Sequence, residues 1–162
     1  MKSVFAGAAI TVLMAVPLPA LSADFTTIVL EKTVNAAPAR TWAKIGPYCD
    51  GIREWFKVTC EITAGDGKSV GTVRRLRGTL DEVMVAATPY SYTYTQPTTT
   101  ILYHGTLALE PLDGGRRSRI VYTLFYDAAS LETAEKKAED RAARTKRFSD
   151  ALDNMKAMAE AR

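Results

Sequence analysis

The chain has 162 residues, of which 47% are apolar and 24% charged, and its formal net charge is +3. This balance excludes a disordered chain, a collagen-like fibre and a small disulfide framework, and it predicts one globular domain. The charges change sign often along the sequence, so no polybasic stripe marks a nucleic-acid partner and we expect none.

Residues 1–23 have the pattern of a secretory signal peptide. A single charge, Lys2, precedes an apolar run, and small residues end the segment at Ala23. The apolar run is shorter than the roughly 20 residues that span a bilayer, which argues against the alternative of an uncleaved membrane anchor. We therefore expect a mature domain of residues 24–162 that is periplasmic or secreted and has no membrane span after cleavage.

Cys49 and Cys60 are the only cysteines of the chain. In the oxidising space that an exported protein reaches, such a pair predicts a structural disulfide that closes a short loop. Two separate buried thiols are the alternative. The chain has one histidine, His104, and no CxxC motif, so we expect no metal site and no other cofactor.

A strand and two short helices are the first elements predicted after the signal segment. Residues 25–34 are rich in β-branched residues and alternate as a half-buried strand does. Asn35 is a good N-cap and Pro38 a good first-turn residue for a helix that stops before Pro47. A second helix is expected over about residues 49–56, and the Gly-Pro link predicts a V-shaped pair.

Residues 57–126 have the pattern of an antiparallel meander, in which short strand-like runs alternate with Gly and Pro turns. The last 30 residues change to a helical period, with Ser130 as the expected N-cap. The apolar stripe of this helix consists of Leu131, Ala134, Ala138, Ala142, Thr145, Phe148, Leu152, Met155 and Ala159. Its side chains are small in the first half, at Ala134, Ala138 and Ala142, and large in the second, at Phe148, Leu152 and Met155. The other faces, including residues 135–147, are charged and are expected to be solvated.

These elements predict an α+β fold in which a curved antiparallel sheet wraps around the long C-terminal helix. A strongly twisted sheet curls, and the final helix is the only element long enough to cover the concave face. The small residues in the first half of the helix leave two interpretations open, close packing on the sheet or a cavity beneath the helix.

Aromatic residues are the candidates to line such a cavity. Tyr103 alternates with Gly105 and Leu107 and is expected on the concave face, whereas His104 faces the other way and is expected on the surface rather than as a catalytic base. The other candidates are two strand tyrosines and one tryptophan on each short helix, the tryptophans at the cavity entrance: Tyr94, Tyr122, Trp42 and Trp55. Such a set suits a hydrophobic molecule with a few polar atoms, although each member would also serve as plain core.

A turn centred on Gly78 sets the register of one hairpin. Residues whose numbers sum to 156 then face each other, which pairs Arg74 with Glu82 on one face and Arg75 with Asp81 on the other. Each face of this hairpin therefore carries a pair of opposite charges.

Several segments in a fixed order carry a family resemblance: residues 34–42, 70–74, 92–94 and 103–109, with Glu82, Gly114, Gly115 and Tyr122. On these the chain resembles the START/Bet v 1-like superfamily, in particular its bacterial polyketide cyclase/dehydratase and lipid-transport group, over residues 25–160. It departs from that group at Tyr122, where relatives often have Trp, and in its signal segment, which many relatives lack.

The resemblance implies a helix-grip fold and places Arg74 and Glu82 on the concave side. There the pair would orient a polar head group or hold a ligand carboxylate, or it would simply fix the strand register. The function expected is binding of a small hydrophobic molecule or lipid by Arg74, Glu82 and the aromatic candidates. One alternative is a cyclase/dehydratase-type enzyme acting on a polyketide-like or steroid-like substrate, with a tyrosine or Glu82 in acid/base chemistry. The other is an exported protein with a filled core that acts through protein contacts.

Overall fold

The computed structural model describes residues 23–161 of the chain. The predicted signal peptide, residues 1–23, lies outside the described residues except for Ala23. Within the described part, no helix has both the length and the apolar composition needed to cross a membrane.

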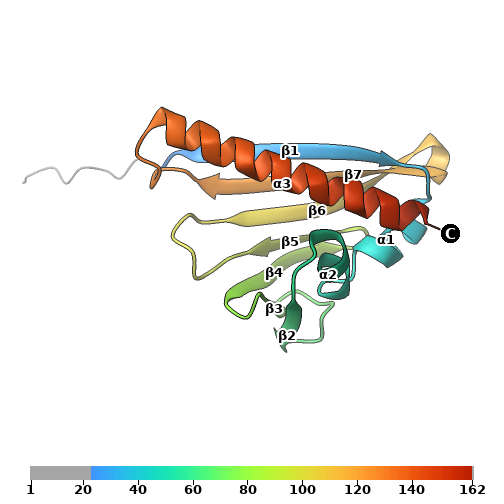
Figure 1. The fold of residues 1–162 in the computed structure, drawn as a ribbon. Helices are drawn as coiled ribbons and strands as arrows, with labels where there is room; N and C mark the ends of the chain where they lie inside the picture. The colour runs from blue at the N-terminus through green and yellow to red at the C-terminus, as the bar shows by residue number, and fades with distance from the viewer. Residues whose placement is uncertain (1–22, 162) are drawn as a thin grey trace, which may run out of the picture.

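Seven antiparallel strands form one sheet: β1 (Phe25–Val34), β2 (Cys60–Ala64), β3 (Val73–Leu76), β4 (Leu80–Thr88), β5 (Ser91–Thr95), β6 (His104–Leu112) and β7 (Arg117–Asp127). Their order across the sheet is β1-β7-β6-β5-β4-β3-β2 (Figure 1). The meander from β2 to β7 is confirmed, because each of these strands pairs with its neighbour in sequence. β1 forms the edge of the sheet beside β7, and it begins and ends at the predicted residues.

Three α-helices lie on one face of the sheet: α1 (Pro38–Ile45), α2 (Asp50–Phe56) and α3 (Ala134–Glu160) (Figure 1). The two short helices after the first strand and the long C-terminal helix are confirmed. α3 packs against β1, α1 and α2. The architecture is therefore the predicted α+β helix-grip fold, a curved antiparallel sheet around a long helix.

The predicted cap of α1 is wrong. Ala37, not Asn35, is the N-cap residue, and it makes no side-chain capping bond. The reason is Pro38 at the start of the helix, because a proline ring forces the residue before it out of the helical region. Ala37 is accordingly extended, with φ −63° and ψ 149°.

The predicted cap of α3 is wrong as well. Ser130 lies in a turn in which the N–H of Leu131 donates to the carbonyl of Ala128 at 3.0 Å, so the helix begins only after this turn. The cap is Thr133, whose hydroxyl accepts from the N–H of Lys136 at 3.2 Å.

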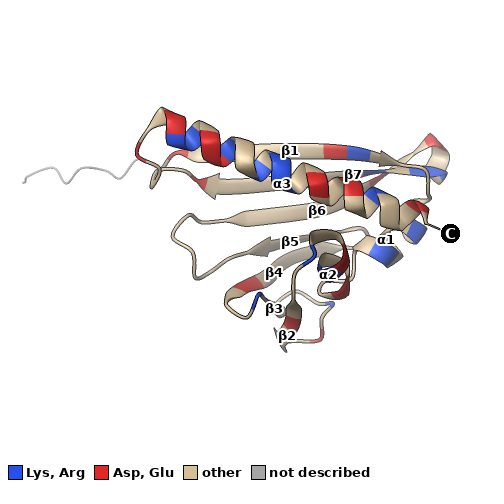
Figure 2. Ribbon diagram, viewed as in Figure 1, with Lys and Arg blue, Asp and Glu red and all other residues tan. Residues whose placement is uncertain are grey.

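Only the second half of α3 is buried. Phe148, Leu152 and Met155 are buried, but the alanines of the first half of the predicted stripe, Ala134, Ala138 and Ala142, are exposed. The stripe is interrupted because α1 and α2, against which α3 packs, lie only beneath its C-terminal half (Figure 1). The exposed alanines therefore do not pack on the concave face, and charged residues of both signs alternate along the helix around them (Figure 2).

The C-terminal end of α3 is held by cations of α1. Lys44 Nζ donates to the carbonyls of Met158 at 2.9 Å and Ala161 at 2.6 Å, and Arg40 Nη2 donates to the Ala161 carbonyl at 2.9 Å. The last carbonyls of a helix lack intrahelical partners and carry partial negative charge. The two cations therefore supply both the missing hydrogen-bond donors and a compensating positive charge. They tie α1 to the C-terminal end of α3.

Candidate functional site

The hairpin of β3 and β4 has the predicted register. Arg74 lies opposite Glu82 and Arg75 opposite Asp81. The first pair is buried on the concave side, as the family resemblance implied, and the second is partly exposed on the outer face. The two pairs sit on adjacent residues of the same strands and differ chiefly in burial.

Arg74 is enclosed by aromatic rings. Its Nε donates to Glu82 Oε2 at 2.7 Å and its Nη1 donates to the carbonyl of Tyr48. Its Nη2 lies 2.6 Å from the same Glu82 oxygen, in ion-pair contact without hydrogen-bond geometry. The guanidinium carbon lies 4.0 Å from the centre of the Tyr48 ring and 5.0 Å from that of Tyr94. Burial disfavours the charge, but Glu82 and the surrounding tyrosines outweigh it and raise the pKa of Arg74.

Both carboxylate oxygens of Glu82 are engaged. Oε2 accepts from Arg74, and Oε1 accepts from Gln96 Nε2 at 2.8 Å. A carboxylate paired and hydrogen-bonded in this way is satisfied without a ligand. Glu82 therefore contributes a fixed, compensated charge to the concave face.

Tyrosine hydroxyls meet beside this pair. The hydroxyls of Tyr94 and Tyr122 are 3.0 Å apart and hydrogen-bonded. Burial raises the pKa of both well above the usual value, and it raises the pKa of Tyr103 to about 12. All three phenols therefore stay protonated at neutral pH, and one of the O–H groups of Tyr94 and Tyr122 donates to the other hydroxyl.

Gly105 makes this arrangement possible. It faces Tyr94 across the β5–β6 pairing, and a side chain there would overlap the Tyr94 ring. The close approach of ring to backbone is available only to glycine.

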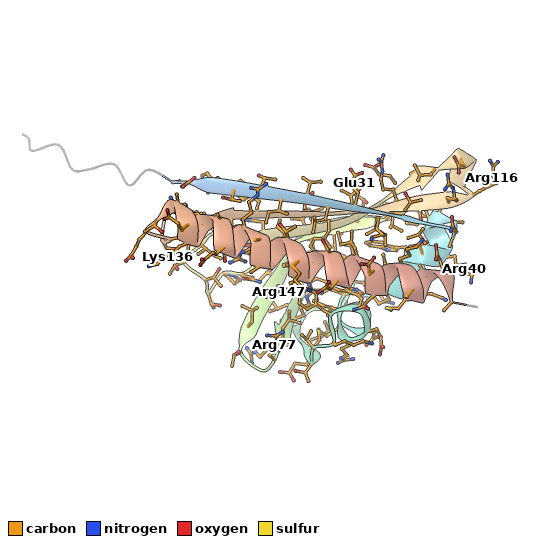
Figure 3. The ribbon with its side chains drawn as sticks, turned by 45° about the horizontal axis from the view of Figure 1, so that its top comes forward. Glu31, Arg40, Arg77, Arg116, Lys136 and Arg147 are labelled. Atoms are coloured by element: carbon orange, nitrogen blue, oxygen red, sulfur yellow. A yellow bond between two sulfur atoms is a disulfide. The ribbon has the colours of Figure 1, made fainter. Side chains whose placement is uncertain are left out.

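An inner cavity of about 160 Å³ lies between the sheet, α2 and the middle of α3. Its apolar wall consists of six side chains: Ile52, Phe56, Val58, Leu76, Leu80 and Phe148. Its polar wall consists of Glu82, Gln96, the three tyrosines Tyr94, Tyr103 and Tyr122, and the arginines Arg77, Arg144 and Arg147. Side chains of the sheet and of the helices extend into the space between them (Figure 3).

The structure brings some of the predicted site residues together at this cavity and not others. Glu82, Tyr94, Tyr103 and Tyr122 lie on its wall, whereas Arg74 is buried behind the wall. Trp55 is not at the entrance as predicted, because it is completely buried and its indole N–H donates to the Ile45 carbonyl at 3.1 Å. Trp42 lines a different pocket.

This outer pocket, of about 560 Å³, lies between α1, α2 and the β4–β5 hairpin. Trp42 and Tyr92 are on its wall, with ring centres 5.8 Å apart. The loop that borders it is ordered by Asp66, which accepts hydrogen bonds from the N–H groups of Lys68 and Ser69 at 2.8 and 2.7 Å. These bonds hold the pKa of Asp66 below its usual value, so the carboxylate stays charged.

Cys49 and Cys60 form a disulfide, with Cα atoms 5.5 Å apart. It ties the start of α2 to the first residue of β2. The alternative of two free thiols is therefore wrong. His104, as expected, is not on the concave face: its Nδ1 lies 2.9 Å from the Leu102 carbonyl and its ring lies against Phe125.

The sequence interpretation missed the arginines of the wall. It assigned residues 135–147 to a solvated face, but Arg144 is only partly exposed, with its guanidinium carbon 4.3 Å from the centre of the Tyr126 ring. Arg147 precedes Phe148, a residue of the apolar stripe, and Arg144 lies one turn before Phe148. That spacing was the available signal, since residues beside a buried stripe border whatever the stripe covers.

Residues 26–160 match the family described as polyketide cyclase / dehydrase and lipid transport. The chain belongs to this family. No curated protein matches the sequence. Membership of the polyketide cyclase / dehydrase and lipid transport family fits the cavity between the sheet and α3, and it leaves the ligand of this member open.

Solved structures share the fold. A solution structure from Thermobifida fusca gives a TM-score of 0.69 at 19% identity, over 80% of this chain and 90% of that one. A protein from Nitrosospira multiformis gives 0.63 at 20% identity, over 82% and 94%. The crystal structure of Ara h 8.0201, a Bet v 1 allergen, gives 0.59 at 18% identity, over 84% and 98%. At these identities the similarity shows the fold alone, which is the Bet v 1-like helix-grip fold.

Proposed function

We propose that this protein binds a small amphipathic molecule, such as a lipid or another hydrophobic compound, in the inner cavity. The observation that carries the proposal is the division of the cavity wall, with apolar side chains on α2, β3 and β4 and protonated tyrosine hydroxyls on β5 and β7. An apolar pocket with a few convergent donors is the usual form of a small-molecule site. The family, described by lipid transport as well as by cyclase chemistry, supports the same conclusion.

The size of the cavity limits how such a ligand binds. About 160 Å³ is well below the roughly 300–1,000 Å³ of pockets that enclose a drug-sized ligand. A drug-sized or larger ligand would therefore insert only its apolar part, among Leu76, Leu80 and Phe148, and leave its head group at the opening. Binding of a longer chain would require α3 or the β3–β4 hairpin to move outward.

Among the described residues, no observation supports acid/base catalysis as the divided cavity wall supports binding. Glu82 would have to release Arg74 and Gln96 before it accepted a proton from a substrate. Burial raises the pKa of Tyr94 and Tyr122, so neither is deprotonated to act as a base at neutral pH and each is a weaker acid than an exposed phenol. Among the described residues the site therefore favours binding over the enzyme alternative, and the presence of a cavity favours it over the protein with a filled core.

Export is part of the proposal. Residues 1–23 would direct the chain out of the cytoplasm, and residues 24–162 would act as the mature domain in the periplasm or outside the cell. The disulfide between Cys49 and Cys60 supports this location, because structural disulfides persist in oxidising compartments.

Native mass spectrometry of the protein purified from its own source tests the proposal. Leu80→Trp would fill the cavity with a large side chain, and Val85→Trp, on the same strand but with an exposed side chain, is the matched control. We expect a small molecule bound one to one in the wild type and in Val85→Trp, and its loss in Leu80→Trp. A bound molecule that Leu80→Trp retains, or none in any of the three, would overturn the proposal.

A further inference from the structure

Arginine side chains gather where the inner cavity opens. Arg77, Arg144 and Arg147 all line it. Arg144 is committed to Asp140, with Nε 2.8 Å from the carboxylate. Within residues 23–161, Arg77 and Arg147 have no ion-pair partner and no side-chain hydrogen bond, and both are exposed. Two guanidinium groups without an ion-pair partner among residues 23–161 therefore border the inner cavity.

The two arginines come from separate elements. Arg77 lies in the turn between β3 and β4, where it adopts φ 52° and its N–H donates to the Thr59 carbonyl at 3.1 Å. Arg147 lies on α3, immediately before Phe148. Figure 3 labels Arg147 at the middle of α3 and Arg77 on the hairpin below it, and both residues line the inner cavity. A group bound between them would contact the sheet and the helix at once.

No acid on the cavity wall offsets this charge. Glu82 is the only acidic residue on the wall among those described, and it is neutralised by Arg74 inside the sheet. The cavity wall thus combines two exposed arginines with apolar side chains, among them Leu76, Leu80 and Phe148. A ligand complementary to this sequence of environments is an apolar chain with an anion at one end.

We infer that the ligand is an amphiphile with a carboxylate head group, held between Arg77 and Arg147, and this inference rests on the proposed binding function. A guanidinium presents two parallel N–H donors that match the two oxygens of a carboxylate. The apolar chain enters the inner cavity, and its head group remains at the opening where both arginines reach it. Arg77 and Arg147 determine specificity for the head group, while the apolar wall binds the chain.

Octanoate and octanol are a matched pair of probes, because they share their apolar chain and differ in head-group charge. Their dissociation constants are measured on the mature protein from saturating shifts in the amide NMR spectrum. We expect octanoate to bind about tenfold more tightly than octanol at low salt, because hydrogen bonds between two charged groups are stronger than those to a neutral hydroxyl and salt screens them. The double variant Arg77→Gln/Arg147→Gln should remove this preference and leave octanol binding unchanged.

Arg116→Gln is the matched control, since Arg116 is also exposed but lies at the far end of the β6–β7 hairpin from Arg77 and Arg147 (Figure 3). It should retain the preference for octanoate. Equal affinities for the two probes in the wild type, or a preference that survives the double variant, would overturn the inference and leave the binding function standing. If neither probe shifts the amides of the cavity wall, the binding function itself fails.

Discussion

Arg74 Nη2 and Glu82 Oε2 lie 2.6 Å apart, and their side chains are 0% and 3% exposed. A buried ion pair adds little net stability because both charges must be desolvated, but the loss of one partner leaves an uncompensated charge in the interior. Arg74 lies behind the cavity wall and contacts two residues of the wall, Glu82 and the ring of Tyr94, and Glu82 in turn accepts a hydrogen bond from Gln96. Its role is to hold the Glu82 carboxylate in place on the cavity wall and to compensate its charge.

Removal of Arg74 is therefore expected to be strongly destabilising. Arg74→Ala should lower the free energy of unfolding by about 3–5 kcal/mol, as for other broken buried pairs. Arg75→Ala, at the partly exposed pair on the outer face, should cost much less, because solvent screens the charges of an exposed ion pair. Urea unfolding measures the loss in the free energy of unfolding for each variant, and the two substituted residues are neighbours on β3.

The double variant Arg74→Met/Glu82→Leu separates charge from packing. It removes both buried charges, so it should recover most of the stability lost in Arg74→Ala. Equal losses in Arg74→Ala and Arg75→Ala would show that the buried pair does not act as described here.

Gly105 gives a second prediction, on packing. Gly105→Ala places a methyl group where the Tyr94 ring lies, so the ring must move away from Tyr122. We expect a loss of about 1–3 kcal/mol in the free energy of unfolding, typical of an overpacked core. Unfolding by urea measures the loss, and a variant as stable as the wild type would mean that Tyr94 has space the structure does not show.

The start of α3 distinguishes two candidate caps. Thr133→Ala removes the hydroxyl that accepts from Lys136 and should cost about 1 kcal/mol, the usual value of an N-cap. Ser130→Ala should have no measurable effect, because Ser130 precedes the helix. Thermal unfolding of both variants decides between them, and the reverse order of stabilities would restore the cap predicted from the sequence.

Stability should also fall at alkaline pH. The pKa of Tyr103 is raised from 10.0 to about 12, so above pH 10 the unfolded chain releases a proton that the folded protein retains. The contribution is complete below pH 10.0 and is lost as the pH rises toward about 12. Urea unfolding at about pH 8 and about pH 11 should show a smaller fall in Tyr103→Phe than in the wild type. Identical falls would argue against a buried, protonated Tyr103.

Much of the fold could be predicted from the sequence because short-range signals determine it. The Gly78 turn and a period of two gave the hairpin register, including the Arg74–Glu82 pairing. The period of three and four located the long helix, although not its cap. Thr133 and Ser130 are chemically similar caps, and only the turn at Ala128 decides between them.

The site was harder to predict, because periodicity shows which face of an element is apolar but not what lies opposite. Trp55 was expected at an entrance and is in the core, where α2 turns it toward Ile45. Arg77 and Arg147 resemble ordinary surface arginines in the sequence. They become part of one cavity only because the folded chain brings the β3–β4 turn and α3 to the same cavity wall.

The most direct test of the account maps where a neutral apolar probe binds. Octanol is titrated into the isotope-labelled mature protein, and amide shifts are compared between the inner cavity and the outer pocket. If the ligand binds in the inner cavity, we expect saturable amide shifts at Ile52, Leu76 and Leu80, with none at Ala43 or Ser91 of the outer pocket. Saturable shifts confined to the outer pocket, or no saturable shift at all, would contradict it.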